Sequence, residues 1–150
     1  MLYHKGVDEQ RALAEARRVL KPGGHILITD CAIPWLWSNH DEAMGAKRRY
    51  YKHELEQLVK EAGFTIRRSS YIFFATFLLF VAVRLLARII PALPASLPAG
   101  TAGGPPKHFV SMPHPVVNRI LIALLGVEAT LLRWVNFQVG SSVLVFGQKA

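Results

Sequence analysis

The residues with the clearest chemical potential gather between positions 35 and 50 of this 150-residue chain. His40 and Asp41 are adjacent, and such a pair invites a metal-binding or acid/base interpretation. Adjacent side chains point in different directions, and no third ligand has a suitable spacing, so no metal site is expected. We interpret His40 and Asp41 as hydrogen-bonding residues that fix a loop and line a substrate site.

Two arginines and a tyrosine follow this loop in the sequence. Arg48, Arg49 and Tyr50 are contiguous, and a guanidinium group binds carboxylates and phosphates through paired hydrogen bonds. Arg49 and Tyr50 are therefore candidate contacts for an anionic substrate. A solvated basic turn explains the same pattern, and the sequence leaves both interpretations open.

Two tryptophans, Trp35 and Trp37, stand in the same segment after Pro34. Proline prevents a regular continuation of the preceding element, so the tryptophans are expected in a loop. Trp37 is a candidate aromatic wall for a substrate. Anchoring of the loop on the core explains these residues equally well, because pockets and cores both favour aromatic side chains.

The elements that position these residues can be read from the local pattern. Asp8 is a suitable N-cap for a helix that extends to about residue 20, with apolar residues at helical spacing. Pro22 and the glycines that follow it stop this helix. Residues 25–29 are mostly apolar without polar alternation, which predicts a parallel strand covered on both faces. This strand ends at Asp30, where ligand sites of α/β sheets are expected.

At this point the residues carry a family resemblance. Residues 2–4, the run Arg-Val-Leu-Lys-Pro-Gly-Gly at 18–24, the strand ending at Asp30, and Gly63 before a later strand together resemble the C-terminal half of a class I S-adenosylmethionine-dependent methyltransferase. The resemblance is to the small-molecule type, and residues 37–50 are similar to a bacterial form of it. It is strong over residues 2–72 and looser afterwards.

The resemblance implies an incomplete α/β sheet of Rossmann-like type, in which the last strand is antiparallel and lies between its two predecessors. It places Tyr3 and His4 at the mouth of the active site. His4 would lie near the transferred methyl group, where its imidazole is a candidate general base. A surface histidine with no chemical role is the alternative. The expected cofactor of the intact domain is S-adenosyl-L-methionine.

No glycine-rich G-x-G-x-x-G turn follows a strand in this sequence, and Gly23-Gly24 follow a helix instead. In the resembled family, the cofactor site is built mostly from strands that would precede Met1. We therefore expect a truncated domain that is inactive alone, or one that is completed by a partner chain.

The remaining elements divide the expected domain into two parts. Helix 51–62, a strand starting at residue 64 and a final strand over 142–148 complete the sheet core of residues 1–70 and 137–150. Residues 71–136 predict an apolar helical cap with two helices, around 71–90 and 116–135. They are joined by a connector over 91–115, which holds seven of the nine prolines.

Composition limits the partners. Residues 67–150 hold eight Lys or Arg and one acid, Glu128, and these cations are embedded in aliphatic runs. This pattern favours contact with an anionic membrane surface and a hydrophobic or lipid-like substrate over a nucleic acid. Residues 69–83 carry no charge, yet a helix that lies at an interface or packs on a partner helix is favoured over a span, because about 20 apolar residues are needed to cross. A tilted span is the alternative.

The localisation expected from the sequence is cytoplasmic, with possible peripheral contact at the inner face of the membrane. No secretory signal is visible at the N-terminus, and the single cysteine, Cys31, excludes an internal disulfide. The alternative to an enzyme is a non-enzymatic membrane-associated protein anchored by its two apolar helices.

Overall fold

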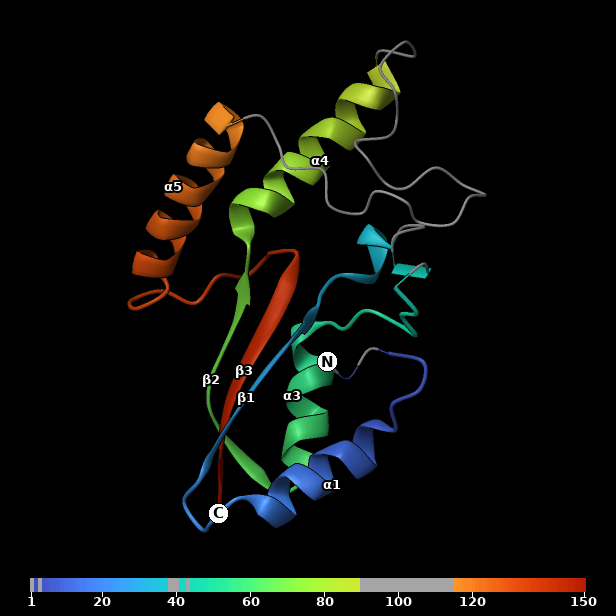
Figure 1. Ribbon diagram of the computed structural model, residues 1–150, viewed down its shortest axis with the longest axis vertical. Coiled ribbons are helices and arrows are strands. Elements are labelled where there is room, and N and C mark those ends of the chain that lie inside the picture. The colour runs from blue at the N-terminus through green and yellow to red at the C-terminus, as the bar shows by residue number, and fades with distance from the viewer. Residues whose placement is uncertain (1, 3, 38–40, 43, 90–114) are drawn as a thin grey trace.

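A computed structural model describes residues 2, 4–37, 41, 42, 44–89 and 115–150. The fold is a small α/β arrangement of an open, three-stranded sheet with helices (Figure 1). In chain order the elements are α1 (Glu9–Val19), β1 (His25–Cys31), the 3-10 turn η1 (Pro34–Leu36), α3 (Lys52–Glu61), β2 (Phe64–Ile72), α4 (Phe74–Ile89), α5 (Pro115–Leu131) and β3 (Ser142–Lys149).

The sheet has the strand order β1-β3-β2, and β3 is antiparallel to both neighbours. Its register places Ile28 and Ser69 on either side of Val145. A register shift between Ile66 and Arg68 marks a bulge in β2. The expected insertion of the last strand between its two predecessors is thus confirmed.

β1 and β2 run in the same direction on either side of the antiparallel β3, but the prediction that both faces of the strand after Gly24 are covered is wrong. Within the described part of the chain, β3 is the strand that pairs with β1, and exposure alternates along β1. Ile28 is buried, whereas Leu27 on the opposite face is 61% exposed. Because apolar residues occupy both faces of β1, hydrophobicity alone gave no sign that one face stays open.

Helix α1 follows the predicted boundaries. The Asp8 side chain accepts a hydrogen bond from the Arg11 backbone N–H, as an N-cap does. At the other end, the Lys149 Nζ donates to the carbonyl oxygens of Arg17 and Leu20, at 2.6 and 2.7 Å. A cation there satisfies terminal carbonyl groups and complements the helix dipole. The final strand therefore fixes the end of the first helix.

Helix α3 also forms where the sequence predicts it, and it ends before Gly63, whose φ of 83° suits glycine. Helices α1 and α3 lie on one side of the sheet (Figure 1). Between them and the strands lies one core, in which α3 contributes two fully buried side chains. Its buried apolar members are Leu2, Leu13, Ile28, Ala32, Ala46, Tyr50, Leu55, Val59, Phe64, Tyr71, Val143 and Val145.

Helices α4 and α5 lie beyond the end of the sheet and extend away from it (Figure 1). Their bounds agree with the two helices predicted within residues 71–136, whereas the connector predicted over 91–115 lies outside the described residues except for its last position. Neither helix, over its described residues, is long and apolar enough to cross a membrane. Whether the pair caps a substrate stays a prediction.

Candidate functional site

The loop that follows β1 folds back on itself through Tyr50. The Tyr50 N–H donates to the Cys31 carbonyl oxygen, and the Ile33 N–H donates to the Tyr50 carbonyl oxygen, both at 3.1 Å. Ile33 has a φ of 60°, a conformation that is unfavourable for a β-branched residue. These two hydrogen bonds bring Tyr50 back to Cys31 and Ile33 and so close the loop at the carboxyl end of β1, where the sequence places its candidate site.

The N-terminal segment packs against this loop. The Leu2 N–H donates to Asp30 Oδ2 at 2.7 Å, and Asp30 is 4% exposed. The Lys5 N–H donates to the Gly45 carbonyl oxygen at 2.9 Å, and His4 forms an isolated bridge with Ala46. The carboxyl end of β1, the N-terminus and the 41–46 turn thus meet in one place.

The structure brings five of the seven predicted site residues into this cluster: His4, Trp37, Asp41, Arg49 and Tyr50. The other two, Tyr3 and His40, lie outside the described residues. Within the cluster, accessibility differs sharply. His4 is exposed and Trp37 half-buried, whereas Asp41 and Tyr50 are buried. Only the first two present substantial surface to a ligand in this conformation.

His4 is exposed, but one of its ring nitrogens already accepts a hydrogen bond from the backbone. The Gly6 N–H donates to His4 Nδ1 at 3.3 Å. The neutral imidazole then carries its proton on Nε2. A role as general base would require the Gly6 contact to open, so that Nδ1 could accept a proton from a substrate. The predicted base role of His4 stays a prediction.

Asp41 and Arg49 form a buried ion pair. Arg49 Nε and Nη2 each donate to Asp41 at 2.9 Å, and Arg49 Nη1 donates to the Ala32 carbonyl oxygen at 3.1 Å. The Arg49 side chain is only 12% exposed. Its guanidinium holds the two ends of the loop together. The Asp41 carboxylate therefore fixes the loop through Arg49, and its predicted contact with a substrate stays a prediction.

A second ion pair, not expected from the sequence, involves Glu9. Arg48 Nη2 donates to Glu9 Oε2 at 2.6 Å, and the Arg48 guanidinium lies 4.6 Å from the centre of the Tyr50 ring. Lys47 Nζ lies 3.5 Å from Glu9 Oε1. Arg48 and Arg49 are therefore neither part of a simple solvated turn nor free cations, because each has a carboxylate partner.

This packing changes the ionisation of two buried groups. Burial alone would raise the pKa of Glu9, but the Tyr50 hydroxyl and Arg48 outweigh it and hold the pKa below its ordinary value of 4.5. The hydrogen bond to Glu9 that the geometry shows comes from Arg48, whereas neither Glu9 Oε1 nor the Tyr50 hydroxyl completes a hydrogen bond among the described residues. Burial raises the pKa of Tyr50, with Glu9 acting in the same direction and Arg48 against it.

The tryptophans divide between the two roles left open by the sequence. Trp37 packs against the core and donates from Nε1 to Glu42 Oε1 at 3.4 Å. Trp35 is 53% exposed. Trp37 therefore anchors the loop, and Trp35 is the more accessible of the two rings. The sequence alone did not separate them.

Neither thiol nor metal chemistry is supported by the described part of the chain. Burial raises the pKa of Cys31, and the Asp41 and Asp30 carboxylates add to this effect against the opposing charge of Arg49. The thiol is therefore protonated near neutral pH and is a poor nucleophile. Among residues with described positions, no three His, Cys, Asp or Glu side chains gather closely enough to hold a metal ion.

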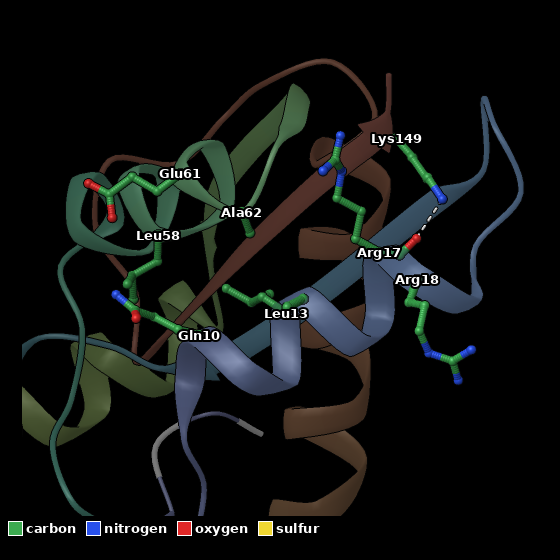
Figure 2. Close-up of a pocket in the computed structure, with 9 residues that line it drawn as sticks. Gln10, Leu13, Arg17, Arg18, Leu58, Glu61, Ala62 and Lys149 are labelled. Carbon is green, nitrogen blue, oxygen red and sulfur yellow. Dashed lines mark hydrogen bonds between the residues drawn. The ribbon is translucent and has the colours of Figure 1, made fainter.

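An open groove of about 740 Å³ lies between α1 and α3, away from the loop cluster (Figure 2). Its floor includes the buried Leu13, and none of the predicted site residues lines it. Figure 2 shows the Lys149 ammonium directed toward the Arg17 carbonyl oxygen. The lining residues are Gln10, Leu13, Ala14, Arg17, Arg18, Leu58, Glu61, Ala62 and Lys149.

No protein family matches the chain, and no curated protein is similar to it in sequence. Among solved structures, the phosphoethanolamine N-methyltransferase 2 of Haemonchus contortus, in complex with S-adenosyl-L-methionine, is similar with 15% identity and a TM-score of 0.44. The similarity covers 95% of this chain and 30% of that chain. This chain thus spans less than a third of the length of that enzyme.

Proposed function

We propose that this chain forms the acceptor-binding part of an S-adenosylmethionine-dependent methyltransferase that acts on a small, hydrophobic or lipid-like acceptor. The observation that carries the proposal is the position of β3, antiparallel between β1 and β2. This order is the one that the residues at 18–30 imply through their resemblance to class I methyltransferases. The two signals are independent, since one is local sequence and the other is long-range pairing.

The location of the loop cluster adds support. In open α/β sheets, ligands bind beyond the carboxyl ends of strands that share one direction, as β1 and β2 do on either side of β3. His4 and Trp35 are accessible residues near the carboxyl end of β1. Trp35 offers an apolar surface to an acceptor, and the apolar α4 and α5 follow the adjacent end of β2. A hydrophobic acceptor suits these surfaces better than a highly charged one, because the exposed Arg48 and the mostly buried Arg49 already have carboxylate partners.

S-Adenosylmethionine supplies an electrophilic methyl group when it is bound. The described residues do not form a site for it by themselves. The Asp30 carboxylate accepts from Leu2 and the Asp41 carboxylate from Arg49, and no glycine-rich turn follows a strand in the sequence. What this chain contributes is therefore positioning: residues 31–50 form a closed loop that fixes where an acceptor can lie.

The test compares this chain with a longer protein. By calorimetry, we expect the 150-residue chain to show no binding of S-adenosylmethionine. The same chain joined to the strands and glycine-rich turn of a class I methyltransferase, or mixed with a partner chain that carries them, is expected to bind it. The completed protein should transfer a radiolabelled methyl group to extracted hydrophobic acceptors, and Trp35→Ala should raise KM more than it lowers kcat.

Two results would contradict the proposal. One is low-micromolar cofactor binding by this chain alone, and the other is the lack of methyl transfer by every completed form that binds the cofactor. The second result would favour a non-enzymatic, membrane-associated protein. The exposed apolar surface of α5 is the observation in favour of that alternative.

A further inference from the structure

Helix α5 buries only one narrow stripe. Its half-buried or buried positions are Asn118, Leu121, Leu125 and Glu128, which recur at helical spacing, and α4 is its neighbour. The rest of the helix is exposed and mostly apolar. The large exposed side chains on it include Ile120, Ile122, Leu124, Val127 and Leu131, each between 45% and 61% exposed. Such a continuous apolar face marks an interaction site.

The charge on this face has one sign. Glu128 is the only acid in residues 67–150, and it is 6% exposed. Its Oε2 accepts from the Ala75 N–H at 3.4 Å, at the start of α4, where a carboxylate is favoured by the helix dipole. The Glu128 carboxylate is thus buried, and it links α5 to the start of α4. What remains exposed on α5 is mostly apolar, and its exposed charge is cationic.

The cations stand at the two ends of the apolar face. Arg119 lies near the start of α5 and Arg133 follows its end, and both are exposed. Next to Arg133, Trp134 is 83% exposed, the highest value among the exposed large apolar residues described. The turn that carries it is held by Arg68, whose Nε donates to Asn136 Oδ1 at 2.8 Å. Trp134 is therefore held in an exposed position by a clamp from β2.

From these observations we propose that the outer face of α5, with Arg119, Arg133 and Trp134, docks on the surface of an anionic lipid bilayer. A helix of 17 residues is about 25 Å long, so it can lie along a flat surface with its cations at the headgroups. Tryptophan favours this interface, and arginine adds attraction to anionic lipids. A second copy of the chain fits less well, since it would bring the same cations together.

The first test uses Trp134 as a reporter. The chain has three tryptophans, so Trp35→Phe with Trp37→Phe leaves Trp134 as the only indole. Vesicles of phosphatidylcholine containing phosphatidylglycerol are expected to shift its emission to the blue and to shield it from an aqueous quencher. Unchanged emission and full quenching on vesicles would overturn the proposal.

The second test measures flotation with the same vesicles at low salt. Arg119→Glu with Arg133→Glu should lower the partition coefficient by about 30-fold or more. Lys5→Glu with Arg11→Glu changes the net charge equally at exposed positions of the N-terminal region, and it should have a much smaller effect. Added salt should lower binding of the wild-type chain and leave the arginine variant nearly unaffected.

A matched pair of substitutions tests how much apolar burial contributes to vesicle binding. Ile122 and Leu27 are both 61% exposed, one on α5 and one on the sheet. Ile122→Ser should weaken vesicle binding by about tenfold, whereas Leu27→Ser should not change it. Equal effects of both substitutions, or a wild-type chain that stays in the soluble fraction, would overturn the proposal. So would a dimer formed through α5 that excludes vesicles. None of these readouts depends on methyl transfer, so failure here is separate from failure of the proposed function.

Discussion

Arg49 makes three hydrogen bonds that tie together the two sides of the loop after β1: two to the Asp41 carboxylate and one to the Ala32 carbonyl oxygen. The pair is almost fully enclosed, with side-chain exposures of 12% and 3%. An arginine that the sequence offered as a substrate contact therefore has a structural task in this conformation. Its role in binding a substrate stays a prediction.

Removing one partner of this pair should be costly. Asp41→Ala leaves the Arg49 guanidinium without its carboxylate in a mostly buried place, and we expect it to lower the free energy of unfolding by about 3 kcal/mol. Asp41→Ala with Arg49→Met should recover part of the loss. Urea denaturation of the two single variants and the double variant gives the coupling energy. Glu15→Ala, which breaks the exposed pair with Arg18, is the control and should have no measurable effect.

Acid should weaken the fold through Glu9. Its pKa is lower in the folded chain than the ordinary 4.5, so ionised Glu9 stabilises the fold above that value, and the contribution is lost as the pH falls through the folded pKa. Urea midpoints measured from neutral to acid pH should therefore fall more steeply for the wild-type chain than for Glu9→Gln. Identical slopes would show that the Arg48 contact has no net effect on stability.

Tyr50 should make the stability of the fold decrease as the pH rises in the alkaline range, whereas Glu9 makes it decrease as the pH falls. Burial raises its pKa in the folded chain, so its neutral form is stabilised. Stability is retained below the ordinary pKa of 10.0 and lost as the pH rises above it. The ultraviolet ionisation signal that Tyr50→Phe removes should therefore appear only on unfolding. Because its hydroxyl lacks a hydrogen-bond partner among the described residues, Tyr50→Phe should be neutral or stabilising. A clear loss of stability would show that the hydroxyl is satisfied in solution.

Two glycines should respond oppositely to the same change. At Gly140 a Cβ atom would overlap the Ile72 carbonyl oxygen at the end of β2, so Gly140→Ala should destabilise the fold by about 1–3 kcal/mol or more. At Gly126, on α5, a Cβ would meet nothing within 4 Å. Gly126→Ala should stabilise by about 0.5–1 kcal/mol, since alanine is the better helix former. Thermal melts of both variants check the pair, and equal shifts would contradict it.

Local signals made much of the fold predictable. Asp8 marks the start of α1 and Gly63 the end of α3, and each acts only on neighbouring residues. The sequence therefore predicts both helices close to their observed bounds. The position of β3 followed from the family resemblance and not from any local pattern. The open face of β1 was missed, because a strand with apolar residues on both faces looks the same whether or not a helix covers the second face. Leu27 is the residue that shows the difference.

The site was predictable in location but not in its pairing. Asp41, Arg49 and Tyr50 do lie at the carboxyl end of β1, where ligand sites of α/β sheets are expected. The partners of the arginines were not readable, because Arg48 pairs with Glu9 from another element, 39 positions away. Ion pairing between distant segments leaves no periodic signal. The sequence also did not predict which side chains are accessible: Trp35 is exposed, whereas Trp37 packs against the core.

The position of β3 also governs how the chain can fold during synthesis. His25 pairs with Gln148, and Phe64 with Lys149, so both outer strands leave the ribosome long before the strand that joins them. Until β3 is made, β1 and β2 lack the strand that joins them, and their apolar side chains are open to wrong pairing. A chaperone that holds nascent chains should therefore be needed most while residues 73–141 are being made.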